Sequence, residues 1–345
     1  MYRTKAQSIN ALAANSLVED LQHYFVSQLN KISGSAQGEA SFEAVEWFRD
    51  MGLHGGGVRY VATNAMVFNR ASVNVSQIHY DNDSSKTLAS ATALSTIIHP
   101  LNPNAPSVHM HISWTEMKNG KGYWRMMADL NPAIENEDAA LLFGNEIKKV
   151  APEQYAVAET QGDRYFYIPA LERHRGVSHF YLEEYNGGNE QDDFDLAKSL
   201  GMAVINIYMA IFQQAIKNHP NPTEEDYNKQ LAYHTLYLFQ VLTLDRGTTS
   251  GLLVHNQNDV GIMGSLPANI DKALLSSWKG KLAAPQDQLL QRILQVLPDH
   301  QPCLIDEQVK LALANVVRQH YKSNPKALTM QAQGKIIPPT VDNHR

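Results

Sequence analysis

The stretch "HPLNPNAPSVHMHISW", from His99 to Trp114, holds side chains well suited to chemistry. His109 and His111 stand two residues apart, and residues at that spacing point to the same face of a β-strand. Imidazoles bind first-row metal ions, and they also transfer protons near neutral pH. The stretch therefore predicts a metal site with His99 as a third ligand, an acid–base site, or a strand that carries ordinary structural histidines.

The composition indicates a soluble globular protein. The chain has 345 residues, 43% of them hydrophobic, which is enough for one large domain or two ordinary ones. No window approaches the roughly 20 apolar residues of a membrane span, and the N-terminal stretch lacks the apolar run of a secretory signal. The single cysteine, Cys303, excludes an intramolecular disulfide framework and indicates a reducing compartment. We expect a cytoplasmic protein.

Charge and motifs exclude several classes of protein. The formal net charge of −6 argues against a nucleic-acid binder, which normally presents a basic face. The sequence contains neither a GxxxxGK[ST] phosphate loop nor a GxGxxG turn, and Gly55-Gly56-Gly57 is too short to serve as one. No CxxC or HExxH pair provides a strong metal signature.

Residue periodicity predicts helices and strands in blocks. Residues 7–32 have helical spacing and should end before the glycines at 34 and 38. Alternation predicts strand pairs within 57–78 and 94–114, with turns at "TNA" and "PLNPNAP". The other expected elements are a strand in "KGYWRMMADL", a helix from about Asn136, a strand in "VSHFYLEEY", a helix over 192–219, strands in "TLYLFQVLTL" and "DRGTTSGLLV" that turn at Arg246-Gly247, and helices over 286–296 and 307–321.

Runs of strands flanked by helical blocks, without regular βαβ alternation, predict an α+β fold with a largely antiparallel sheet. We expect a single domain over residues 1–275 and a C-terminal helical extension with a tail over 276–345. The tail from residue 322 contains three prolines and several basic residues, so we expect it to be flexible or packed against a partner.

The segments, taken in order, resemble the oxygen-dependent coproporphyrinogen III oxidase family between Gly55 and Pro267. The stretches that carry the resemblance are "GGGVRYVATNAMVFNRASVNVSQIH", "STIIHPLNPNAPSVHMHI", "YWRMMADLNPAIENEDAALLF", "HRGVSHFYLEEY" and "LDRGTTSGLL…IMGSLP". The family implies a large antiparallel sheet flanked by helices on both faces, and a homodimer. It also implies oxidative decarboxylation of porphyrinogen propionates by dioxygen, without a metal or organic cofactor.

The resemblance assigns roles to particular residues. Asp129 matches an aspartate that acts at pyrrole nitrogens, and His109 matches a proton-transfer histidine. Residue type alone leaves Asp129 as a turn cap and each histidine as a structural residue. The residues implied to contact the substrate are Ser95, His99, His111, Ser113, Arg175, Arg246 and Asn258. Arginine is the natural partner of a carboxylate, although Arg246 also fits a role in bracing a turn.

Several positions depart from the family pattern. The family's arginine four residues after the catalytic histidine is Ser113 here, and a second arginine corresponds to Asn258 or Gln257. The glycine-rich run before the aspartate is "RMMA", which adds bulk where a flat macrocycle needs room. Phe239 and Val241 stand where the family has polar residues. We therefore expect an altered substrate pocket.

Three hypotheses follow. The first is a cofactor-free, oxygen-dependent oxidative decarboxylase that acts on a tetrapyrrole or another electron-rich carboxylate. The second is a non-catalytic protein that binds a tetrapyrrole or another planar ligand. The third is a metal-dependent oxidase that uses His99, His109 and His111.

Overall fold

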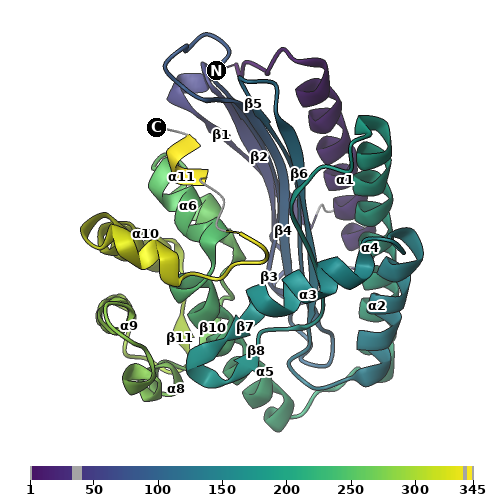
Figure 1. Ribbon diagram of the computed structural model, residues 1–345. Coiled ribbons are helices and arrows are strands. Elements are labelled where there is room, and N and C mark those ends of the chain that lie inside the picture. The colour runs from purple at the N-terminus through teal and green to yellow at the C-terminus, as the bar shows by residue number, and fades with distance from the viewer. Residues whose placement is uncertain (1, 33–40, 337–339, 344–345) are drawn as a thin grey trace.

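A seven-stranded antiparallel sheet forms the centre of the molecule (Figure 1). The computed structural model describes residues 2–32, 41–336 and 340–343. The sheet has the strand order β1-β2-β3-β4-β5-β6-β9. Its strands are β1 (Phe42–Phe48), β2 (Gly55–Ala62), β3 (Phe68–His79), β4 (Leu88–Pro100), β5 (Ser107–Met117), β6 (Gly122–Asn131) and β9 (Val177–Tyr185). From β2 to β6, each strand pairs with the strand before it in sequence, and β9 pairs with β6.

Helices cover both faces of this sheet, which confirms the predicted α+β fold (Figure 1). On one side lie α1 (Ile9–Ile32), α2 (Glu137–Val150) and α4 (Glu190–Asn218). On the other side lie α5 (Glu224–Thr243), α6 (Arg246–Val254), α9 (Gln286–Val296) and α10 (Glu307–Ser323). The shorter helices are α3 (Tyr155–Phe166), α7 (Asp259–Ile262), α8 (Lys272–Ser277) and α11 (Thr340–Asn343). There are also two small two-stranded sheets, which pair β7 (Tyr167–Ile168) with β8 (Arg173–His174) and β10 (Asn269–Ile270) with β11 (Cys303–Leu304).

The two faces of the sheet differ in chemistry because side chains alternate along each strand. On the face toward α1 and α4, Met110, Met126 and Phe180 join the apolar core with Phe25 and Tyr208. The opposite face carries polar side chains near its centre. They are Ser72, Asn74, Ser76, Ser95, His109, His111, Ser113, Arg125 and Asp129.

A second apolar core lies beyond the polar face. Leu238 of α5, Leu290 of α9 and Val317 of α10 belong to this one cluster. The predicted division of the chain at residue 275 stays a prediction. Within the described ranges, α4 alone is long and apolar enough to cross a membrane, and half of its most apolar stretch is buried in the protein, which is also typical of a core helix.

The predicted strands in "TLYLFQVLTL" and "DRGTTSGLLV" were wrong, because both segments are helical. A capping box at Thr223 and Asp226 starts α5, and the Asp245 side chain accepts a hydrogen bond from the Thr248 amide to start α6. Every residue from Tyr233 to Thr243 is buried. A helix buried on all sides lacks an amphipathic period, so its apolar run resembles a strand.

The other predicted elements agree with the structure, including the helix that follows Asn136, which is the N-cap of α2. Helix α1 ends at Ile32, and the glycines at 34 and 38 lie outside the described residues. Strand β1 and helix α3 were not predicted.

The C-terminal segment up to Ile336 packs on its own chain, which corrects the expectation of a flexible or partner-bound tail. The amides of Lys335 and Ile336 donate hydrogen bonds of 2.9 and 3.1 Å to the Glu183 carboxylate on β9. The Arg164 guanidinium donates to the Gly334 carbonyl at 2.7 Å. These bonds hold the segment beside the edge of the sheet.

The start of β2 requires glycine, which leads to a stability prediction. Gly55 has φ +89°, and a Cβ atom there would lie 2.2 Å from the Gln77 carbonyl oxygen of β3. Gly120 has a similar φ of +84° with no atom within 4 Å of an added Cβ. We expect Gly120→Ala to lower the free energy of unfolding by about 1 kcal/mol and Gly55→Ala by about 3 kcal/mol, because only the second adds a clash. Urea denaturation measures both; equal losses would contradict the role of the clash.

Candidate active site

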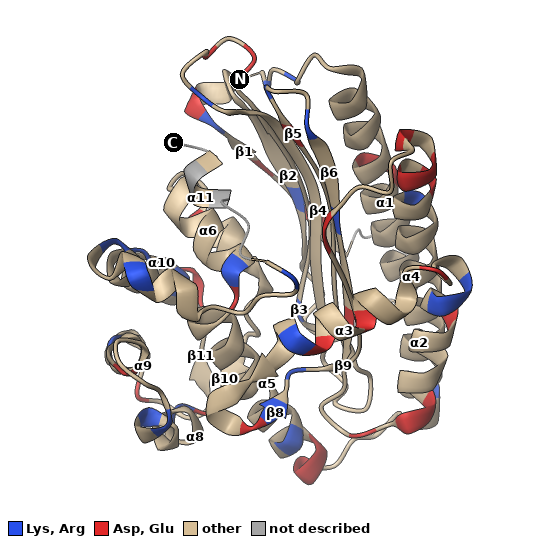
Figure 2. Cartoon of the chain, viewed as in Figure 1, with Lys and Arg blue, Asp and Glu red and all other residues tan. Residues whose placement is uncertain are grey.

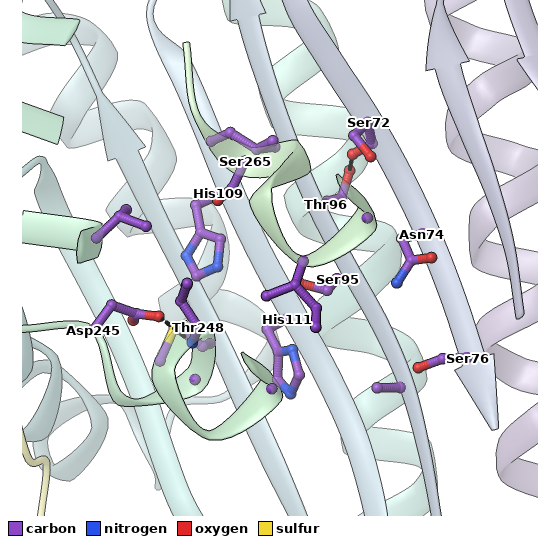
Figure 3. A pocket seen from close by; sticks show the side chains of 18 of the residues that line it. Ser72, Asn74, Ser76, Ser95, Thr96, His109, His111, Asp245, Thr248 and Ser265 are labelled. Carbon is purple, nitrogen blue, oxygen red and sulfur yellow. Dashed lines mark hydrogen bonds between the residues drawn. The ribbon is translucent and has the colours of Figure 1, made fainter. Parts of the chain in front are cut away.

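A cavity of about 250 Å³ lies between the polar face of the sheet and the segment from α5 to α7 (Figure 3). A second cavity of about 200 Å³, the side cavity, shares several lining residues with the first. The sheet lines the main cavity with small polar side chains, and α6 approaches closely through Gly247 and Gly251.

His109 and Asp129 form a hydrogen-bonded pair beneath this cavity. They are direct partners in the β5–β6 register, and His109 Nδ1 lies 2.7 Å from Asp129 Oδ1. Because an ionised carboxylate only accepts hydrogen bonds, Nδ1 carries the proton. In the neutral form of the ring, Nε2 keeps its lone pair, and no hydrogen bond reaches this atom from the described residues. His109 lines the cavity (Figure 3), so Nε2 is available to take a proton from a ligand.

Asp129 itself is completely buried and does not line the cavity. Its Oδ2 atom accepts hydrogen bonds from Arg175 at 3.0 Å and from the Asn131 amide at 2.6 Å. Burial alone would raise the pKa of the Asp129 carboxyl, but the nearby Arg175 and His109 outweigh it and hold the pKa well below its ordinary range. The carboxylate is therefore ionised and acts on ligands only through its neighbours.

Both terminal nitrogens and both faces of the Arg175 guanidinium have partners, whereas its Nε has no hydrogen-bond partner among the described residues. Its second terminal nitrogen donates to Gln240 Oε1 of α5 at 2.8 Å. The guanidinium stacks between the rings of Phe166 and Tyr237, 4.4 and 4.6 Å from their centroids. Arg175 lines the cavity, but its main contact is with Asp129, so it is placed to keep that carboxylate ionised.

Four more of the predicted residues gather at the cavities. Ser95 and His111 are paired across β4 and β5 and line the main cavity. Ser113 lines the side cavity, where its hydroxyl lies 2.9 Å from His111 Nε2. Asn258 lines both cavities. Burial, and to a smaller extent the charge of Arg125, lowers the pKa of His111 well below its ordinary value, so this ring is neutral.

The structure places His99 and Arg246 away from the cavity walls. His99 is completely buried, with Nε2 3.0 Å from the Ser265 carbonyl and Nδ1 2.8 Å from the Ser107 hydroxyl. Arg246 pairs with Glu183 and donates to the Ile336 carbonyl at 3.0 Å. His99 is thus a structural histidine, and Arg246 braces the tail against the sheet. No three potential ligands in the described part of the chain gather closely enough to hold a metal ion.

The sequence interpretation missed several residues that line the main cavity. Arg125, Tyr165 and Tyr237 reach it from β6, α3 and α5. Alternation along β6 could have identified Arg125, since it lies on the same face as Met127 and Asp129. Of the two methionines in "RMMA", only Met127 points into the cavity, while Met126 belongs to the apolar core on the other face. Val241 lines the cavity, whereas Phe239 packs in the second core.

The fold and the site together define an α+β protein with a buried histidine–carboxylate pair that opens into a polar cavity. Such a pair is typical of enzymes that transfer protons. The family model described as coproporphyrinogen III oxidase matches residues 13–297. The chain therefore belongs to the coproporphyrinogen III oxidase family, as its sequence motifs indicated.

Individual relatives are similar at a lower level. The chain is 26% identical over 298 residues to the mitochondrial oxygen-dependent coproporphyrinogen-III oxidase of Rattus norvegicus, covering 79% of this chain and 65% of the relative. The Homo sapiens protein of the same name is 25% identical over 296 residues, covering 79% of this chain and 63% of the relative. The oxygen-dependent coproporphyrinogen-III oxidase of Rickettsia bellii (strain RML369-C) is 28% identical over 245 residues, covering 66% of this chain and 84% of the relative. The chain thus spans a little under two thirds of the mammalian relatives.

The buried carboxylate leads to a prediction on stability and pH. We expect Asp129→Asn to lower the free energy of unfolding by about 3–5 kcal/mol at neutral pH, because Arg175 would be left buried without its charge partner. The folded-state pKa of Asp129 lies below its unfolded value of 3.8, so this contribution is complete above that pH and is lost as the pH falls through the folded pKa.

Urea denaturation between pH 8 and pH 3.5 measures this effect. The difference between wild type and Asp129→Asn should be constant down to about pH 5 and shrink below about pH 4. Asp20→Asn, at an exposed carboxyl of α1, is the matched control and should show little change. A difference that grows on acidification would mean that Asp129 is protonated in the folded protein.

Proposed function

We propose that this protein is an oxygen-dependent oxidase that decarboxylates propionate side chains of a coproporphyrinogen-like tetrapyrrole. The observation that carries the proposal is the His109–Asp129 pair, with the free His109 Nε2 facing the cavity of a chain that belongs to this family. A homodimeric assembly and the absence of a cofactor stay predictions.

The reaction is balanced with dioxygen as the only oxidant. Each propionate, R–CH2CH2–COO⁻, loses carbon dioxide and a hydride equivalent to become a vinyl group, R–CH=CH2. Dioxygen takes the hydride equivalent together with one proton and becomes hydrogen peroxide. An electron-rich pyrrole can react with dioxygen once its N–H proton has been removed, so the protein must supply a base and an enclosed site.

His109 is the base in this mechanism. Its Nε2 atom takes the pyrrole N–H proton, and the resulting imidazolium is stabilised by Asp129 at 2.7 Å. Asp129 is a positioning residue, because it is buried behind His109 and fixes the ring through Nδ1. Arg175 keeps Asp129 ionised and therefore keeps His109 in the tautomer that presents a free Nε2 to the substrate.

The shape of the cavity supports a substrate site that differs from the family pattern. Met127 lines the cavity from β6, directly opposite His111 on β5, where the family has glycine. Val241 adds a second apolar side chain from α5. We infer that these two side chains narrow the space available to a flat macrocycle and place the reacting pyrrole closer to His109.

The mechanism predicts a large loss of activity in His109→Gln. We expect turnover of coproporphyrinogen III under air to fall by about 100-fold to 10,000-fold, because glutamine cannot accept the pyrrole proton. Porphyrin fluorescence after oxidation and hydrogen peroxide release measure the product, with an anaerobic sample as the blank. His23→Gln on the exposed face of α1 is the control and should retain full activity. Wild-type protein that binds porphyrin without any turnover would favour a non-catalytic binding role.

The narrowed cavity predicts a gain in binding. Met127→Gly removes a bulky side chain that lines the main cavity, so the affinity for coproporphyrin III should rise. Fluorescence titration measures the dissociation constant. Met126→Gly is the matched control, because Met126 lies in the core on the opposite face and its loss costs stability without enlarging the cavity. Weaker binding by Met127→Gly would mean that the methionine contacts the ligand favourably.

A further inference from the structure

Few charged residues lie along the central strands of the sheet (Figure 2). Of the residues that the structure describes, two arginines line the main cavity, Arg125 of β6 and Arg175. Arg175 donates hydrogen bonds to Asp129 and Gln240. Arg125 is half-buried and also lines the side cavity. No hydrogen bond or ion pair joins its guanidinium to any residue that the structure describes.

The acidic group that faces Arg125 is already occupied. Asp245 lies across the cavity at the start of α6, and its Oδ1 atom accepts a hydrogen bond from the Tyr165 hydroxyl at 2.8 Å. Its Oδ2 atom accepts from the Thr248 amide at 2.7 Å. Burial alone would lower the pKa of Arg125, but the nearby tyrosine hydroxyls and Asp245 outweigh it, so the guanidinium is charged. Arg125 therefore presents unused donors in a partly desolvated cavity, and a ligand carboxylate is their natural complement.

The register of the sheet fixes where such a carboxylate would lie. Arg125 is directly opposite Ser113 on β5, and it stands four residues along β6 from Asp129. At about 3.3 Å per residue, Arg125 and Asp129 are about 13 Å apart along the strand. The Met127 side chain lies between them on the same face. A ligand bound by Arg125 would extend over Met127 toward His109.

We propose that Arg125 anchors a carboxylate of the tetrapyrrole while a pyrrole N–H of the same molecule reaches His109. This inference rests on the proposed function and specifies how the substrate is held. Position 113, where the sequence comparison expects an arginine, carries serine, and the arginine stands on the paired position of the neighbouring strand. The anion-binding group is thus displaced by one strand, about 5 Å, toward β6 and β9. This displacement changes which carboxylate of a ligand can be bound while a pyrrole of the same ligand faces His109. We therefore expect it to change the substrate specificity.

Binding titrations test the anchor independently of turnover. The probes are coproporphyrin III, which has four free carboxylates, and its tetramethyl ester, which has none. Wild type should bind the free acid more tightly than the ester. Arg125→Gln should weaken binding of the acid by about 30-fold or more and leave binding of the ester unchanged. Arg125→Lys should retain part of the preference, because it keeps the charge and loses the bidentate geometry.

Two further variants serve as controls. Arg292→Gln removes an exposed arginine of α9 and should leave both affinities unchanged. The double variant Ser113→Arg/Arg125→Gly returns the cation to β5 and should recover most of the preference for the acid. Thermal melting confirms that each variant is folded. An Arg125→Gln protein that binds the acid as tightly as wild type would overturn the anchor.

Turnover measured on the same proteins separates this inference from the proposed function. A preference for the acid that depends on Arg125, found in a protein without turnover, supports the anchor and contradicts the oxidase. Turnover that is unaffected by Arg125→Gln at low substrate concentration supports the oxidase and contradicts the anchor. A wild-type protein that binds neither the acid nor the ester contradicts both.

Discussion

The ion pair between Asp129 and Arg175 is the interaction on which the site depends. It joins β6 to the segment before β9, and Arg175 extends the network to α5 through Gln240 and Tyr237. Taking two charges out of water is costly, and only a full set of partners offsets that cost. The hydrogen bonds from His109 and Asn131 complete this set at the carboxylate. The cluster therefore tolerates little displacement, and the orientation of the His109 ring follows from it.

The chemistry of the sheet explains why a cavity forms beside this cluster. A sheet covered by helices on both faces usually has apolar residues on both. Here the face toward α1 and α4 is apolar, and the centre of the other face carries serine, asparagine, histidine and arginine. The second core therefore closes around the polar area and leaves a space there. Gly247 and Gly251 of α6 help to enclose this space without filling it.

Much of the fold could be predicted from local patterns, because alternation and helix caps are properties of short segments. The strands around the histidines and the helix after Asn136 are examples. The helical stretch 235–243 could not be predicted, since a helix buried on all sides and a buried strand have similar composition. The site was predictable only in part. Asp129 and His109 are 20 residues apart in sequence and become neighbours through strand register. The family pattern drew attention to the arginine absent from position 113, and only the structure shows where Arg125 points.

The order of the strands has a consequence for the way the chain acquires its site during synthesis. From β1 to β6, each strand pairs with the one made just before it, so most of the sheet can assemble from contacts that are close in sequence. Helices α5 and α6, which close the cavity, are made only after β9 and α4. The polar face therefore stays open to water until α5 and α6 have emerged, and the space beside His109 becomes enclosed only after the seven strands of the sheet have been made.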